Sequence, residues 1–212
     1  MKHLKLFEDF EDLISRESRT RTKPLSEEEF LELIKENCKQ FSFSNDQLWR
    51  KSDDYFGGMG IFFESERKST IGNFNYKTFF DLRKEYPVPR YKSLIGSTTK
   101  KGADYFGSGD KTYLVIPFDN SQIVFAGSPD LALWSKVGQE FSDDLFVKQS
   151  YSYDFKVPHQ ELESIKSSSK LSGWLTKLSE FGFEFFTTSP CLLIHESKVD
   201  WLKDNLSVKS NS

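Results

Sequence analysis

Apolar side chains recur at helical spacing in two stretches near the start of the chain. In residues 1–14 they are spaced by three and four positions, which predicts a short amphipathic helix: Leu4, Phe7, Phe10, Leu13 and Ile14. Ser26 followed by Glu29 is the pattern of a capping box, and the apolar positions after it predict a helix that ends near residue 39. The stretch between the two helices is polar and basic. We therefore expect residues 1–25 to form a leader helix and a flexible linker, and the folded domain to begin at residue 26.

Short apolar runs bounded by Gly, Pro or polar residues predict strands along the rest of the chain. The strand candidates are 46–52, 58–66, 88–96, 111–118, 121–127 and, as two short strands around a turn, 183–196. The runs at 111–118 and 121–127 are strongly β-forming and are separated by a short turn, so we expect them to form a hairpin. Helices are expected at 76–86, 99–106 and 128–134, from Pro158 onward, over 170–181 and around Trp201. Residues 138–157 show no clear pattern, and the irregular mixture indicates an α+β fold with a single domain over 26–208.

Composition narrows the class of protein. The 212 residues include 21 Phe, so aromatic packing is expected to dominate a sizeable core. A net charge of -3 argues against nucleic-acid binding through a generally basic surface. No run approaches the roughly 20 apolar residues of a membrane span, and the N-terminus lacks the apolar core of a signal peptide. We therefore expect a soluble, intracellular protein with no membrane partner.

The cysteines and histidines do not form a recognisable metal or nucleophile site. Cys38 and Cys191 lie far apart without zinc-like spacing, so both are predicted to be buried thiols and no metal is expected. Cys191 and His195 would sit roughly 13 Å apart in an extended strand, too far for a catalytic dyad. Walker A, GxGxxG, HExxH and GxSxG motifs are absent from the sequence.

Three short motifs, in chain order, resemble those of a known enzyme family. The stretch SLIGSTTKKGADYFG (93–107) is an apolar run broken by a glycine and followed by three hydroxyl side chains before a helix. It resembles the serine–threonine strand and following helix of arginine-type ADP-ribosyltransferases. LWRK (48–51) resembles their first-strand LYRG, and GFEFF (182–186) resembles the strand that presents their catalytic glutamate. Over 46–195, the chain is similar to small ADP-ribosyltransferase-like proteins of large tailed phages, most clearly in TYLVIPFDNSQIVFAGSPDLAL (112–133).

The resemblance implies a split β-sandwich with peripheral helices and a reaction with NAD. Cleavage of the nicotinamide–ribose bond builds positive charge on the ribose carbon, and a carboxylate such as that of Glu184 can stabilise it. The guanidinium of Arg50 can bind a phosphate by two parallel hydrogen bonds. Ser97 is expected to position the glutamate. The remaining predicted cofactor contacts are Thr98 through its hydroxyl, Gly96 through close backbone approach, and Tyr105 through ring stacking.

The sequence departs from the family pattern in ways that leave the acidic residue open. Lys51 replaces the usual glycine, Trp49 replaces a tyrosine, and no E-x-E precedes Glu184. An E-x-E does occur in HQELESIK, which ends at Glu163. We therefore rank Glu184 first, Glu163 second and Glu180 third as the key acid.

Each candidate also has a purely structural interpretation. Arg50 could be an exposed charge at a strand edge, and Ser97 and Thr98 could cap the helix that follows. Glu184 could be the outward residue of a strand whose flanking phenylalanines face inward. Tyr105 and its neighbour Phe106 could belong to the core.

The N-terminus supplies a second resemblance. MKHLKLFEDFED is similar to the leaders of phage proteins packaged inside the head, and Leu6-Phe7-Glu8 fits the cleavage pattern of a prohead protease. This implies packaging through residues 1–14, carriage inside the virion and action in the host bacterial cytoplasm. The leading hypothesis is transfer of ADP-ribose from NAD to a host protein or nucleic acid. The alternatives are a non-catalytic virion or host-binding protein of the same fold, and an unrelated small phage structural protein.

Overall fold

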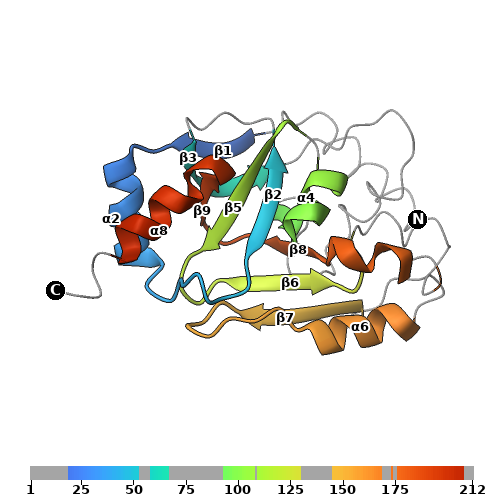
Figure 1. The fold of residues 1–212 in the computed structure, drawn as a ribbon. Helices are drawn as coiled ribbons and strands as arrows, with labels where there is room; N and C mark the ends of the chain where they lie inside the picture. Colours follow the sequence, from blue (N-terminus) through green and yellow to red (C-terminus); the bar gives the residue numbers. More distant parts are fainter. Residues whose placement is uncertain are drawn as a thin grey trace, which may run out of the picture.

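The computed structural model describes residues 19–52, 58–66, 93–107, 109–129, 145–168, 173 and 176–207. Its strands are β1 (Arg19–Pro24), β2 (Leu48–Ser52), β3 (Met59–Glu66), β4 (Leu94–Ser97), β5 (Lys111–Pro117), β6 (Gln122–Ala126), β7 (Phe146–Ser150), β8 (Glu184–Thr187) and β9 (Cys191–His195) (Figure 1). The described helices are α2 (Glu27–Asn37), α4 (Lys100–Phe106), α6 (His159–Ser168) and α8 (Val199–Ser207), with 3₁₀ turns η3 (Thr176–Phe181) and η4 (Glu196–Lys198). The fold class is α+β, as the sequence predicted. None of the helices described here is both long and apolar enough to cross a membrane.

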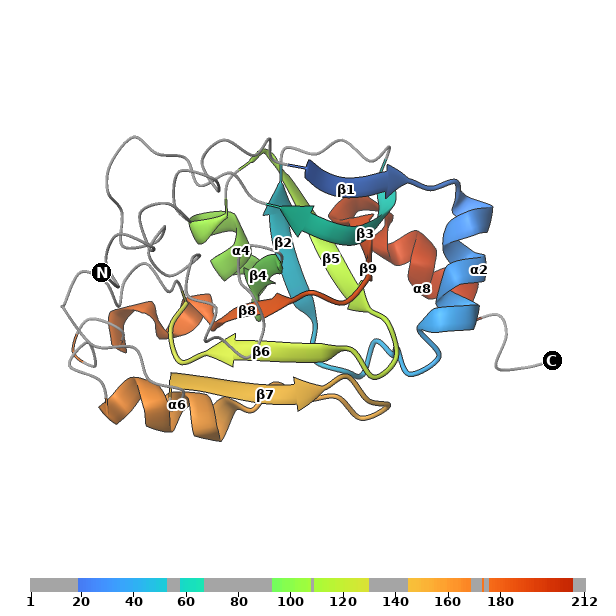
Figure 2. The same cartoon turned by 180° about the vertical axis from the view of Figure 1, so that it is seen from behind.

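The nine strands form one sheet in the order β1-β3-β9-β5-β2-β4-β8-β6-β7, and every pairing is antiparallel. The sheet changes direction in its middle. Strands β2 and β5 share five residue pairs, whereas β2 and β4 share the single pair Trp49 and Ser97. From that point the strands diverge, and β6 and β7 run across β2 and β5 in both views (Figures 1 and 2). The sheet therefore consists of two halves joined at one residue pair.

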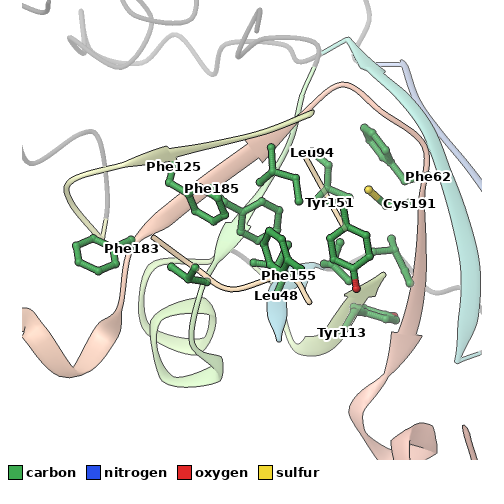
Figure 3. Close-up of a cluster of buried hydrophobic side chains, with 14 of the residues drawn as sticks. Leu48, Phe62, Leu94, Tyr113, Phe125, Tyr151, Phe155, Phe183, Phe185 and Cys191 are labelled. Atoms are coloured by element: carbon green, nitrogen blue, oxygen red, sulfur yellow. The ribbon is translucent and has the colours of Figure 1, made fainter. Parts of the chain in front are cut away.

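The main hydrophobic core lies between these halves. Both contribute to it: Leu48, Tyr113 and Leu193 come from the first half, and Phe125 and Phe185 from the second. Figure 3 shows the cluster, with Phe183 at one end and Phe62 and Cys191 at the other. A second cluster covers the opposite face of the first half beneath α2 and α8, which lie side by side at one end of the molecule (Figures 1 and 2).

Helix α2 begins where the capping-box pattern predicts. The Ser26 hydroxyl accepts a hydrogen bond from the Glu29 amide at 3.2 Å, and the Glu29 carboxylate accepts one from the Ser26 amide at 2.8 Å. Phe30 and Ile34 are buried on the face that packs against β3 and β9. The prediction of this helix is confirmed.

The first strand corrects the prediction of a flexible linker. Residues 19–24 pair with β3, which places Arg19 opposite Glu66 and Arg21 opposite Glu64. The alternating threonines of this stretch favour extended chain. The sheet therefore begins at Arg19 and not after residue 25.

The predicted hairpin of 111–118 and 121–127 is also wrong. Both strands exist, but β5 pairs with β2 and β9, whereas β6 pairs with β8 and β7. The turn between them carries Asn120 at φ 62°, and the Asp119 carboxylate accepts the amides of Lys39 and Gln40 at 3.0 and 2.9 Å. These bonds turn the chain away from β5, so it crosses from one half of the sheet to the other.

Other expectations fall partly outside the described residues. The helices predicted at 1–14 and 76–86 lie outside them, as does most of that at 128–134. The region without a clear pattern contains β7, and the described end of the helix predicted at 170–181 is η3. The two strands predicted within 183–196 are present as β8 and β9.

Cys38 and Cys191 are free and buried, as predicted, and burial raises the pKa of both thiols. The folded protein keeps these thiols protonated, whereas in the unfolded chain they ionise above about pH 8.5. The unfolded state then binds fewer protons, so the free energy of unfolding falls as the pH rises, by about 1.4 kcal/mol per pH unit for each thiol. Urea unfolding between pH 8 and 10 measures this slope. The Cys38→Ala/Cys191→Ala variant should show a shallower slope, and equal slopes would contradict the prediction.

Candidate functional site

The three motifs meet at the junction between the two halves of the sheet. Ser97 on β4 pairs with Trp49 on β2 at one side and with Glu184 on β8 at the other. Arg50 follows Trp49 directly along β2. The sequence separates these residues by up to 134 positions, from Arg50 to Glu184 (184 − 50), and the strand order brings them to one place. Helix α4 lies beside this junction in both views (Figures 1 and 2).

Arg50 is half-buried at this junction. It pairs with Tyr113 on β5, and its Nη1 donates a hydrogen bond to the carbonyl oxygen of Ile95 on β4 at 3.0 Å. The guanidinium thus reaches across the break between β2 and β4. The interpretation of Arg50 as an exposed strand-edge charge is wrong, because the residue is partly covered and its strand is central.

Glu184 is buried, with 3% of its surface exposed. Its neighbours Phe183 and Phe185 point into the main core, as the alternation predicts, and Glu184 lies on the other face of β8. That face of β8 is covered by protein and not exposed to solvent, so the interpretation of Glu184 as an outward-facing residue is wrong. Its amide donates to the Ser128 carbonyl at 2.8 Å. Carboxylates are almost never fully buried unless they are paired, so burial of Glu184 is consistent with its having an interaction partner inside the protein.

The hydroxyls of the serine–threonine motif hold the turn that precedes Glu184. Ser97 Oγ donates to the Phe181 carbonyl at 3.1 Å. Thr98 Oγ1 accepts from the Phe183 amide at 2.8 Å, and the Thr98 amide donates to the Phe183 carbonyl at 2.9 Å. Together these bonds fix both sides of the turn through which the chain enters β8.

The cap of α4 is Thr99, whose Oγ1 accepts from the Gly102 amide at 3.0 Å. The interpretation of Ser97 and Thr98 as helix caps is therefore wrong. The three consecutive hydroxyls have separate tasks: two hold the turn before β8 and the third begins the helix.

Two glycines allow the backbone to approach closely at this site. A Cβ on Gly96 would lie within 3.0 Å of the Trp49 carbonyl and the Phe185 ring, so the strand crossing accounts for this glycine. Gly182 adopts φ +67°, a conformation that glycine adopts readily, and allows the turn before β8. From the sequence, Gly96 is predicted to contact the cofactor. The left-handed conformation of Gly182 is not predicted, because the letters GFEFF do not indicate it.

Tyr105 is exposed by 66%, so it does not belong to the core. Its ring lies 4.5 Å from that of Phe181 and 4.9 Å from that of Phe106, measured between centroids. These contacts hold an exposed aromatic side chain beside the turn that leads to Glu184. Ring stacking by Tyr105 stays a prediction.

The competing glutamates lie outside the three strands of the junction, on α6 and η3. Glu163 lies on α6, half-exposed, and binds the Lys166 ammonium at 2.7 Å. Glu180 is exposed on η3 and pairs with Lys101 at 2.6 Å. The partner of Glu163 is on its own helix, whereas the partner of Glu180 is on α4, so neither glutamate belongs to a strand of the junction. Glu184 is the candidate glutamate whose strand pairs with the serine–threonine motif.

Lys51, which stands in place of the family's glycine, is anchored to α4. Its Nζ donates to the Asp104 carbonyl at 3.2 Å, and the Asp104 carboxylate accepts from Thr112 Oγ1 at 2.5 Å. Lys100, at the start of the same helix, forms an ion pair with Glu196 in η4, and the hydrogen bond from this pair raises the pKa of Lys100. These three interactions tie helix α4 to the first half of the sheet, through β2, β5 and the turn after β9.

A row of side chains extends from Arg50 across the first half of the sheet, and sequence reasoning missed it. Tyr113 pairs with Arg50 on one side and with His195 on the other. The His195 and Tyr113 rings lie 5.6 Å apart, and His195 Nδ1 is 2.7 Å from Ser197 Oγ. Among the described residues, no group of three potential metal ligands gathers at this site or elsewhere.

Comparison with known proteins finds no protein-family model, no curated protein and no solved structure that matches this chain. The fold defines an α+β protein whose nine described strands form one antiparallel sheet in two halves. The residues at the junction of β2, β4 and β8 are therefore the basis for inferring an activity.

Proposed function

We propose that this chain is an ADP-ribosyltransferase-like enzyme that cleaves NAD and transfers ADP-ribose to a macromolecule. One observation carries the proposal: adjacent strands bring the backbones of Arg50, Ser97 and the buried Glu184 to a single junction. The residue types and their chain order match the resemblance found in the sequence.

The residues present suit the chemistry. NAD supplies the ADP-ribosyl group when its nicotinamide–ribose bond breaks. The buried Glu184 carboxylate stabilises the positive charge that develops on the ribose, in a site where low local polarity strengthens the interaction. Arg50 offers a planar, permanently charged donor for a phosphate oxygen. Ser97 and Thr98 fix the turn that sets the position of Glu184.

The test is nicotinamide release from NAD by the purified protein, alone and in bacterial lysate, with Arg50 variants beside it. Arg50→Ala should raise KM for NAD by about tenfold or more, since a charge-assisted hydrogen bond to phosphate is lost. Arg50→Lys should recover part of the loss, because it keeps the charge without the bidentate fork. Lys35→Ala on the exposed face of α2 is the control. An unchanged KM in Arg50→Ala would remove Arg50 from the site.

The second candidate function is a non-catalytic binding protein of the same fold, which acts in the virion or on a host partner. Lys51 favours it, because this side chain is anchored to α4 where the family has a glycine. The backbone bonds of the Ser97 and Thr98 hydroxyls also fit a purely structural use of the motif. Binding of ADP-ribose without nicotinamide release, in buffer and in lysate, would support this candidate over the enzyme. The host and virion setting of either function follows from the N-terminal resemblance.

A further inference from the structure

Helix α6 contains a buried lysine that the proposed chemistry does not use. The side chain of Lys166 is 8% exposed, whereas that of its ion-pair partner Glu163 is 48% exposed. Lysine is among the residues least often buried. Because this side chain is buried, the protein groups around it determine the position of its ammonium.

The ammonium of Lys166 lies over the ring of Phe183, 5.6 Å from its centroid. The His159 ring, from the first residue of the same helix, lies 5.9 Å from the same phenyl ring. Phe183 is at one end of the core cluster (Figure 3), and two side chains of α6 contact its ring there. A cation above an aromatic face is attracted to it, most strongly when water is excluded.

The same helix supports the other neighbour of Glu184. Ile165 packs so closely on Gly127 that a Cβ there would lie within 3.0 Å of it. Gly127 precedes Ser128, whose carbonyl accepts the Glu184 amide at 2.8 Å. Helix α6 thus contacts the groups on both sides of the glutamate: the ring of Phe183 before it and the segment that binds its amide.

We propose that Lys166 is a positioning residue for Glu184, acting through the ring of Phe183. Thr98 holds the Phe183 backbone from one side, and Lys166 holds the ring from the other. Because Glu184 is the next residue, the orientation of Phe183 sets where the carboxylate stands. The role of Lys166 in the reaction rests on the proposed function. Its effect on the backbone of Phe183 and Glu184 does not.

The chain provides a matched control on α8. Lys203 also forms an i,i+3 ion pair, with Asp200 at 2.9 Å, and its Nζ also lies 5.6 Å from a ring centroid, that of Phe43. Phe43 packs against the cluster beneath α2 and α8, away from the junction. Lys203→Met therefore removes an ion pair and a cation–ring contact of the same kinds, from a more exposed lysine, without touching the support of Glu184.

The experiment compares Lys166→Met, Lys166→Arg and Lys203→Met by amide hydrogen exchange, thermal unfolding and nicotinamide release. In Lys166→Met we expect the Phe183 and Glu184 amides to exchange about tenfold faster, kcat to fall about tenfold with KM for NAD unchanged, and Tm to hold or rise. Tm should hold because a buried charge is removed and the half-exposed Glu163 stays solvated. Lys166→Arg should restore both exchange and kcat, since a guanidinium also binds over a ring face. A merely structural lysine would not lower kcat while Tm holds.

Two results would overturn the inference. The first is wild-type exchange at Phe183 and Glu184 in Lys166→Met, and the second is the same acceleration in Lys203→Met. If the wild-type protein releases no nicotinamide, the proposed function fails and the exchange rates alone decide the role of Lys166.

Discussion

Replacing Glu184 by glutamine lowers the rate of nicotinamide release by about a hundredfold or more, without unfolding the protein. The reason is the difference between charge and shape. Glutamine fills the same volume and keeps a carbonyl oxygen, but it has no negative charge to oppose the positive charge that develops on the ribose. Since Glu184 is 3% exposed, water cannot replace the lost charge. Single-turnover rates with saturating NAD measure the effect directly.

The stability of this variant separates loss of chemistry from loss of structure. Glutamine keeps the volume of the Glu184 side chain but weakens the interactions of its carboxylate in the folded protein, so we expect a lower Tm in Glu184→Gln and a protein that stays folded at the assay temperature. The control is Glu180→Gln, which loses an exposed pairing with Lys101 and should keep both activity and Tm. Persistent release in Glu184→Gln together with loss in Glu180→Gln would move the key acid to η3. An equal loss of nicotinamide release in Glu184→Gln and Glu180→Gln would indicate that both substitutions disturb the turn before β8.

The elements that the sequence predicted well have local causes. Helix α2 follows from a reciprocal pair of side-chain bonds three residues apart, Ser26 and Glu29. Strand β2 likewise coincides with a short apolar run. Helix α4 begins after its cap Thr99 and ends before Gly107, as predicted. In each case the deciding interactions lie within a few residues, so the pattern of the sequence contains them.

The errors arose where distant partners decide the structure. The basic stretch at 19–24 is polar enough for a linker, and the edge of β3, 40 or so positions away, makes it a strand. Strands β5 and β6 look like a hairpin because they are adjacent in sequence, but each finds other partners across the two halves of the sheet. The pattern of apolar and polar residues within a strand does not show which distant strand it pairs with.

The candidate site divides in the same way. Its residue types were predicted, since Arg50, Ser97 and Glu184 were chosen from short motifs. The roles of Thr98 and Gly96 could not be predicted, because they depend on tertiary contacts. Thr98 binds the Phe183 amide, and Gly96 allows close approach to Trp49 and Phe185. Lys166 gave no signal, since lysine three residues after a glutamate in HQELESIK is typical of a solvated helix face.

Gly102→Ala is the substitution with the largest expected effect on stability. Alanine favours a helix over glycine by about 1 kcal/mol, so α4 alone would gain from the change. At this position, however, a Cβ would lie within 3.0 Å of the Phe181 carbonyl and of Ser97 Oγ, the two atoms that the bond across the turn joins. Overpacking of this kind costs about 3 kcal/mol, which leaves a net loss of about 2 kcal/mol and a fall in Tm of about 4–8 °C.

The same substitution at Gly173 is the control, because a Cβ there meets nothing within 4 Å. Gly173 is also helical, so Gly173→Ala should keep or raise Tm while Gly102→Ala lowers it. The opposite signs isolate the contact of α4 with the turn from the propensity of the residue. Because this contact also sets the approach to Glu184, Gly102→Ala should lose nicotinamide release at temperatures where it is still folded. Equal Tm values in the two variants would mean that α4 does not press on the turn before β8.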